Sequence, residues 1–140
     1  MRKWIAAALV LMPLPALAAS VTVSGAWIRA LPAQLPAAGY FVAHNTGKSA
    51  IAITGAQAAA CGTLMLHQSV RGNGMDRMEH VTRVAVPAGG TAAFAPGGYH
   101  LMCVNPKAAI RPGAQIPVTL RFSDGTNLTV PFAVRNARGK

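Results

Sequence analysis

The chain has 140 residues, of which 52% are hydrophobic and 11% are charged, and this composition excludes a disordered tail protein. Fourteen glycines and ten prolines argue against a helical bundle, and two cysteines are too few for a cysteine-based zinc or iron–sulfur cluster. Thirteen basic residues against three acidic ones give a formal net charge of +10 on a length that suits one domain.

Residues 1–18 have the pattern of a secretory signal peptide. Arg2 and Lys3 precede a short, uncharged apolar stretch, and Ala16-Leu17-Ala18 supplies the small residues that signal peptidase accepts. We expect cleavage near Ala18, which leaves residues 19–140 as one exported domain that is not an integral membrane protein. Loss of the two basic residues lowers the net charge to about +8.

The basic charge of an exported domain indicates anionic head groups or acidic proteins as partners. The basic residues are scattered, except for Arg135, Arg138 and Lys140 at the C-terminus. No aromatic residues alternate with this cluster, as they do in proteins that bind single-stranded nucleic acid. We therefore expect no nucleic-acid partner.

Short apolar segments separated by turn residues predict an all-β fold. Asp124-Gly125, between two such segments, indicates a hairpin. We expect a Greek-key sandwich or barrel of about eight to nine strands and no helix of ten residues or more after residue 20. The candidate strands are 21–28, 39–45, 51–56, 63–67, 77–84, 91–94, 99–104, 116–122 and 127–134.

Two histidines and two methionines form the most informative pattern. His100 and Met102 are two residues apart, so on a strand their side chains share one face, which we expect to be the face away from the core. His67 ends one predicted strand, and Met78 lies near the start of the next. Thioethers are soft, neutral ligands that select Cu(I), and they suit an oxidising compartment where thiolates are unsafe.

His67, Met78, His100 and Met102 match the H-x10-M-x21-H-x-M motif, and on these residues the chain resembles the PCu(A)C family of periplasmic copper chaperones. The resemblance covers nearly all of residues 19–140. It implies a cupredoxin-like β-barrel that binds one Cu(I) in the periplasm. It also implies delivery to the subunit of cytochrome c oxidase that carries the CuA site, together with a Sco-type thiol protein. Further segments that resemble sequences of this family are 25–29, 37–41, 86–90, 96–102 and 120–125.

Other side chains compete for a role at this site. Met75, in the predicted loop before Met78, is a candidate extra ligand or a cover for apolar surface. His80 shares a face with Met78 and is the alternative nitrogen donor. Met65 shares a face with His67, and we assign it to packing around the site.

Three residues are expected to lie outside the metal site. His44 has no soft ligand beside it and is assigned a structural or surface role. Trp27 is expected to anchor the core, because a buried indole removes much apolar area from water. Arg29 is expected to be solvated on the opposite face.

Cys61 and Cys103 are the only cysteines, and an oxidising compartment favours a disulfide between them. Strand alternation puts their side chains on opposite faces, so we expect a bulge at Gly62 to reorient Cys61. A buried free thiol, or Cys103 as an extra soft ligand beside Met102, are the alternatives.

Other functional classes fit less well. A blue-copper electron-transfer site needs a cysteine thiolate followed by a histidine, and no histidine follows Cys103. A thiol–disulfide oxidoreductase needs a closely spaced cysteine pair, and a hydrolase needs a catalytic group of residues that is not evident. A metal-free adhesive domain is the remaining alternative. We therefore expect a metal carrier and not an enzyme.

Overall fold

The computed structural model describes residues 20–140, and the predicted signal peptide lies outside the described residues. No helix in the described part of the chain is long and apolar enough to cross a membrane. The all-β prediction is confirmed. The elements are β1 (Val21–Arg29), the 3-10 helix η1 (Pro32–Gln34), β2 (Ala37–Asn45), β3 (Ile51–Gln57), β4 (Cys61–Gly72), β5 (Met75–His80), β6 (Val84–Val86), β7 (Thr91–Phe94), β8 (Tyr99–Pro106), β9 (Gln115–Phe122) and β10 (Asn127–Arg135).

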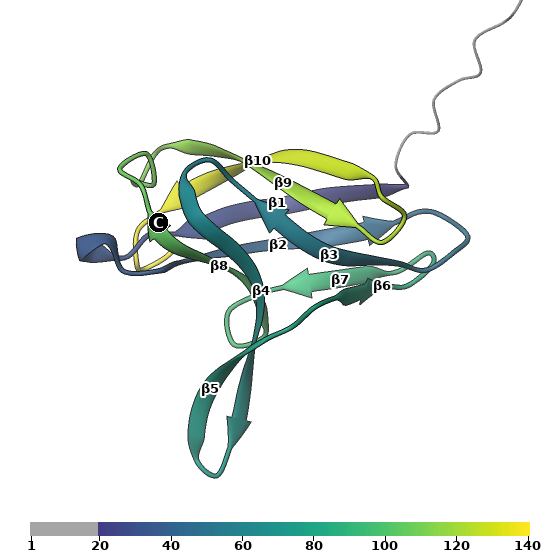
Figure 1. Cartoon of the computed structure of the whole chain (residues 1–140), viewed down its shortest axis with the longest axis horizontal. Coiled ribbons are helices and arrows are strands. Elements are labelled where there is room, and N and C mark those ends of the chain that lie inside the picture. Colours follow the sequence, from purple (N-terminus) through teal and green to yellow (C-terminus); the bar gives the residue numbers. More distant parts are fainter. Residues whose placement is uncertain (1–19) are drawn as a thin grey trace, which may run out of the picture.

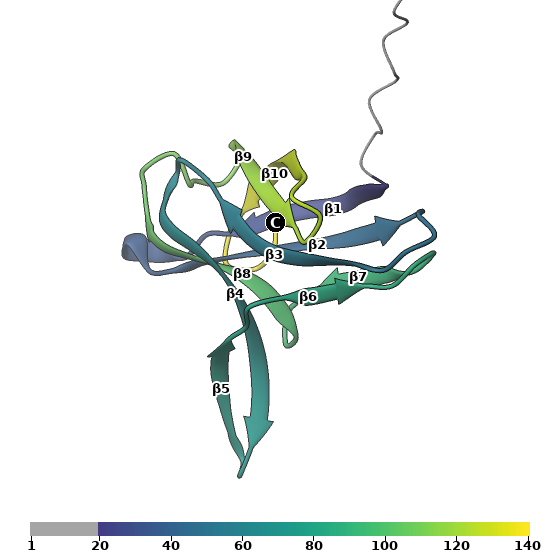
Figure 2. The ribbon, with the colours of Figure 1, turned by 45° about the vertical axis from the view of Figure 1, so that its right-hand side comes forward.

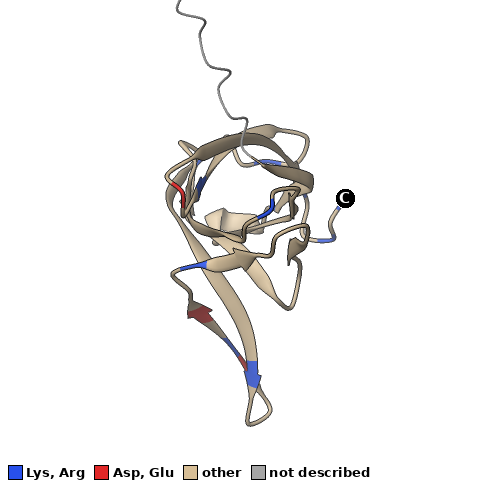
Figure 3. Cartoon of the chain, turned by 90° about the vertical axis from the view of Figure 1, so that its right-hand side faces the viewer, with Lys and Arg blue, Asp and Glu red and all other residues tan. Residues whose placement is uncertain are grey.

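All ten strands belong to one sheet, in the order β5-β4-β8-β7-β2-β1-β10-β9-β3-β6. In addition, β8 pairs with β2, and β3 contacts β4, so the sheet curls around one core (Figures 1 and 3). The β4–β5 hairpin projects away from this curled body, as Figures 1 and 2 show from two directions.

Strict alternation of apolar residues explains why the predicted strands form. In β9, the four side chains of Ile116, Val118, Leu120 and Phe122 point inward and are buried, and the residues between them are more exposed. β9 pairs antiparallel with β10 across the Asp124-Gly125 turn, which confirms the predicted hairpin.

Three phenylalanines from different strands form the centre of the core. The rings of Phe41 and Phe94 stack at 4.3 Å between centroids, and Phe132 meets Phe41 edge-on at 5.8 Å. Such pairs contribute about 0.5–1.5 kcal/mol each beyond the area that they bury.

A β-bulge in β1 makes the prediction for Trp27 wrong. The pairing of β1 with β2 shifts by one residue between Ser24 and Trp27, around Gly25 with its φ of 61°. The shift moves the inward positions from odd to even residues, so Val21 and Ile28 are buried while Trp27 lies on the outer face.

The predicted strand 77–84 is in fact two strands. β5 pairs with β4, and the chain then leaves the hairpin and forms β6, which pairs with β3 at the other end of the sheet order. β4 is longer than predicted and reaches Gly72. Asn73 and Gly74, with φ values of 51° and 74°, form the tight turn that connects β4 to β5.

Cys61 and Cys103 form a disulfide between β4 and β8, with their Cα atoms 5.4 Å apart. The expected bulge at Gly62 is absent, because one register holds from the Cys61–Pro106 pair to the Gln68–Tyr99 pair. The irregular residue is instead Asn105, with a φ of 52°. A Cβ on Gly62 would lie 2.9 Å from the Cβ of Asn105, so the absence of a side chain on Gly62 allows this close approach.

We predict that a Cys61→Ala/Cys103→Ala double variant loses about 4 kcal/mol of unfolding free energy, because the disulfide closes a loop of about 43 residues in the unfolded chain. Denaturant unfolding of the variant and of the reduced parent chain should give the same midpoint, well below that of the oxidised parent. Equal midpoints for the oxidised and reduced parent would contradict this account.

Candidate metal centre

The four motif residues and His80 lie on one face of three adjacent strands, β5, β4 and β8. In the antiparallel register, His67 of β4 pairs with His100 of β8 on one side and with His80 of β5 on the other. Met65 pairs with Met102, and Met78 pairs with Ser69. Residues that pair directly, and residues two apart on one strand, share a face, so this donor face carries every motif residue.

His67 is the centre of this arrangement. Its ring centroid is 5.7 Å from that of His100 and 6.0 Å from that of His80. Met102 and Met78 occupy the diagonal positions on the two flanking strands, within the range of long side chains. His67 is thus the one motif residue that directly or diagonally neighbours the other three.

The surroundings of His100 orient its ring and leave one ring nitrogen without a partner. Its Nδ1 lies 3.3 Å from the carbonyl oxygen of Gly98, to which the Nδ1–H tautomer donates. This leaves the lone pair on Nε2, which is buried and has no hydrogen-bond partner. In metal-binding histidines, a hydrogen bond of this kind from the other ring nitrogen fixes the tautomer. The only sequence signal for this contact between Gly98 and His100 was the turn at 96–98, just before His100.

His100 lies on the face away from the core, as predicted, but that face is itself covered at this point. His100 lies on the donor face with Met102, as alternation requires, but its side chain is 3% exposed. Its neighbour Leu101, on the inner face, is 1% exposed. Both faces of β8 are therefore covered at this point, a consequence of tertiary packing that a single strand's pattern does not reveal.

The environment of His67 favours a neutral imidazole. Its Nδ1 is buried without a hydrogen-bond partner. Partial burial lowers the pKa of His67 below its usual value of 6.5, and the neighbouring imidazoles of His100 and His80 lower it further. The neutral form is the one that binds metal.

The two methionines of the motif differ in how firmly they are held. Met102 is half-buried between β4 and β2, while Met78 on the projecting hairpin is 60% exposed. They lie two strands and four residues apart, so on a flat sheet their Cα atoms are about 16 Å apart. Met102 therefore sits beside the paired histidines, and Met78 reaches the same ion only if the hairpin bends toward them.

Met75 does not share the donor face. It is the first residue of β5 rather than a loop residue, it pairs with Gly72, and it is 74% exposed. Its odd position relative to Met78 and His80 places it on the opposite face of the hairpin. Register thus separates Met75 from the other donors, whereas His80 lies directly across from His67.

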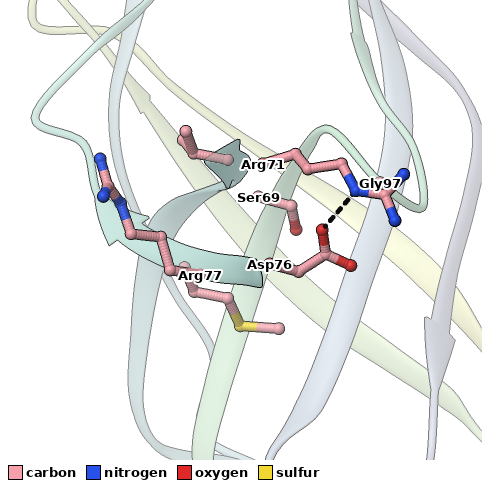
Figure 4. Close-up of a pocket in the computed structure, with 7 residues that line it drawn as sticks. Ser69, Arg71, Asp76, Arg77 and Gly97 are labelled. Atoms are coloured by element: carbon pink, nitrogen blue, oxygen red, sulfur yellow. Dashed lines mark ion pairs between the residues drawn. The ribbon is translucent and has the colours of Figure 1, made fainter. Parts of the chain in front are cut away.

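A groove of about 450 Å³ continues the donor face toward the tip of the hairpin (Figure 4). Met78 and Ser69 line it, and the Gly97 turn faces the hairpin across it. Arg71 and Asp76 form an ion pair of 3.4 Å within it. This open groove gives solvent or a partner access to the side of the donor face where Met78 lies.

Within residues 20–140, no three histidine, cysteine or acidic side chains are placed to hold one metal ion. A site on this face must therefore combine pairs of imidazoles with methionine sulfur or water. Cys103 is not a thiolate in this structure, because its sulfur is bonded to Cys61. A blue-copper site consequently has no cysteine ligand here.

Trp27 and Arg29 lie together on the outer face, so the expected solvation of Arg29 on an opposite face is wrong. The Arg29 guanidinium lies 5.4 Å from the ring centroids of both Trp27 and Tyr40, and Arg135 lies 5.0 Å from that of Trp27.

His44 lies on β2, away from the donor face. Its Nε2 is 2.9 Å from the Ser24 hydroxyl, and the residues that pair with it on neighbouring strands carry no sulfur.

Comparisons with known proteins agree with this fold. Several solved structures are similar. A copper-bound PCuAC domain from PmoF2 is 20% identical with a TM-score of 0.70, covering 84% of this chain and 93% of that chain. A solution structure of CuI-DR1885 from Deinococcus radiodurans is 30% identical with a TM-score of 0.68, covering 86% of this chain and 81% of that chain. The fold is therefore that of the PCuAC domains, as the motif led us to expect.

A sequence relative is known from Leifsonia xyli subsp. xyli, under the name "Putative lipoprotein Lxx21020". The two are 38% identical over 120 residues, which cover 85% of this chain and 72% of the relative. Residues 21–134 match the family described as "Putative lipoprotein LpqE-like". The chain therefore belongs to the LpqE-like family.

Proposed function

We propose that this protein is an exported copper carrier that binds Cu(I) at His67, His100 and Met102, with Met78 as the ligand contributed by the hairpin. The observation that carries the proposal is the buried, unpartnered Nε2 of His100, whose other ring nitrogen is held by Gly98. A buried polar atom without a partner is costly, and a metal ion relieves that cost. Similarity to CuI-DR1885 supports the choice of ion.

The ligand set suits reversible carriage of Cu(I). Two imidazoles and one or two thioethers provide soft, neutral donors without a thiolate, which would hold the ion more tightly and would oxidise outside the cytoplasm. We propose the periplasm as the compartment. We propose the CuA-bearing subunit of cytochrome c oxidase as the recipient, with a Sco-type thiol protein as a further partner. Binding and release of an ion require no catalytic residues.

The charge distribution indicates how a recipient docks. Two of the three acidic residues, Asp76 and Glu79, lie on the hairpin, each with an arginine partner, and Asp124 lies in the β9–β10 turn (Figure 3). The region where the 107–114 loop and the C-terminal segment meet has basic but no acidic side chains among the described residues. The basic residues of this end include Lys107, Arg111, Arg135, Arg138 and Lys140. This basic end favours an acidic partner surface.

We predict that His100→Ala and Met102→Leu each weaken Cu(I) binding by at least about 100-fold, because even the loss of a group that only orients a metal ligand costs about 10–100-fold. Anaerobic competition against a Cu(I)-chelating dye measures the affinity. His44→Ala is the matched control and should bind like the parent chain. Parent-like affinity in both ligand variants would exclude the proposed site.

We predict that Cu(I) affinity is nearly constant from pH 8 down to about 6.5 and falls below that, as protons compete for the imidazoles. The pKa of His67 is lower in the folded chain than in the unfolded chain, so the imidazole of the unfolded chain is protonated first as the pH falls. The apo fold therefore loses stability as the pH falls from about 6.5 toward the pKa of His67 in the folded chain. Denaturant unfolding of the apo chain across this range should show the loss. His67→Gln should remove this part of the dependence of unfolding free energy on pH. An unchanged dependence would contradict the assignment of this effect to His67.

We predict that copper transfer to a CuA-bearing domain slows as salt is raised from low to physiological ionic strength, because screening weakens electrostatic steering. A Lys107→Gln/Arg138→Gln/Lys140→Gln variant should be slower and less salt-sensitive. Lys48→Gln, on the exposed β2–β3 turn, is the control. Stopped-flow transfer rates that do not respond to salt in the parent chain would rule out steering through the basic end.

A further inference from the structure

His80 is a third imidazole on the donor face, outside the four-residue motif. The rings of His100, His67 and His80 form a row across β8, β4 and β5, with centroid separations of 5.7 Å and 6.0 Å. When two imidazoles bind one ion at about 2.0 Å per nitrogen, their centroids lie about 5–6.3 Å apart, depending on the angle at the metal. Both gaps in the row therefore have the width of a two-imidazole metal position.

The two gaps differ in chemistry. On the inner side of His67, His100 is buried and Met102 and Met65 pair beside it, so the position is enclosed and supplied with sulfur. On the outer side, every residue of β5 is exposed, and the donors next to His80 in the register are the Ser69 hydroxyl and the exposed thioether of Met78. An enclosed position with two sulfur donors suits Cu(I), whereas imidazole nitrogen on an open face, where solvent oxygen has access, suits Cu(II).

The two positions are mutually exclusive because both use His67. A neutral imidazole has one lone pair, so His67 binds one metal ion at a time. Building on the proposed carriage of Cu(I), we propose that His67 and His80 form a second, solvent-facing position that takes Cu(II), as the alternative to the inner Cu(I) position. The chain then holds a single copper ion in either oxidation state by exchanging His100 and methionine for His80 and water.

The test compares two variants with the chain disulfide-bonded and intact. In titrations with Cu(II) chloride followed by electron paramagnetic resonance, the parent chain should show coupling to two imidazole nitrogens. His80→Gln should bind Cu(II) about tenfold or more weakly and lose one nitrogen coupling, while its Cu(I) affinity stays within about threefold of the parent. His100→Gln should instead bind Cu(I) more weakly, while it keeps parent-like Cu(II) affinity and both nitrogen couplings. His44→Gln, another histidine outside the motif, should match the parent with both ions.

Three results would overturn the second position. They are parent-like Cu(II) binding in His80→Gln, equal weakening of Cu(I) and Cu(II) in that variant, and a two-nitrogen Cu(II) signal that persists after the chain is loaded with Ag(I), a redox-inert substitute for Cu(I). The last result would show that His67 is not shared. If the parent binds no Cu(I) but His80→Gln still removes Cu(II) binding, the proposed Cu(I) carriage fails and the second position stands.

Discussion

The pairing of β4 with β8 is the constraint on which the donor face depends. Side chains alternate along a strand, so a slip of one residue in this ladder would turn His67 toward the inner face and leave His100 without its partner. The register is fixed at both ends. The Cys61–Cys103 disulfide joins the strands at one end, and the amide of Ser69 donates to the carbonyl of Gly98 at the other, at 3.0 Å. The same Gly98 carbonyl orients His100.

This rigid frame holds polar groups that the apo protein leaves unsatisfied. The buried Nε2 of His100 and Nδ1 of His67 lack partners, and each such atom costs about 1–3 kcal/mol. Structures normally avoid this arrangement, since buried polar atoms usually find a hydrogen bond. Two such atoms on adjacent paired histidines are the observation on which the proposed metal site rests. The disulfide and the aromatic core stabilise the fold against that cost.

The fold was predictable wherever one local rule decided the structure. Alternation in 116–122 and the Asp124-Gly125 turn identified β9 and its hairpin, and the i, i+2 spacing put His100 and Met102 on one face. Prediction failed where pairing between strands decided the structure. The bulge at Gly25 changes which residues of β1 face inward, so Trp27 is outside. The division of 77–84 depends on β5 and β6 pairing with different strands, which only the assembled sheet determines.

The position of His80 illustrates the same limit within the site. Its distance in sequence from His67 says nothing about pairing until the turn at Asn73-Gly74 and the full length of β4 are known. That turn fixes the hairpin register and brings His80 on β5 opposite His67 on β4, whose other neighbour is His100 on β8. The motif spacing identified the candidate ligands that the body of the sheet holds, but the position of the hairpin residues is a property of the hairpin register.

The donor face therefore has a fixed half and an exposed half. His100 and Met102 lie in a strand that is paired on both sides, so little movement is open to them. Met78 and His80 lie on β5, which is the last strand of the sheet, pairs with β4 alone and is exposed along its whole length. A carrier must bind its ion and then release it, and release proceeds most easily from the side where ligands move at little cost in packing. The groove beside Met78 opens on that side, so under the proposed function a ligand from a recipient meets the hairpin before it meets the buried histidine.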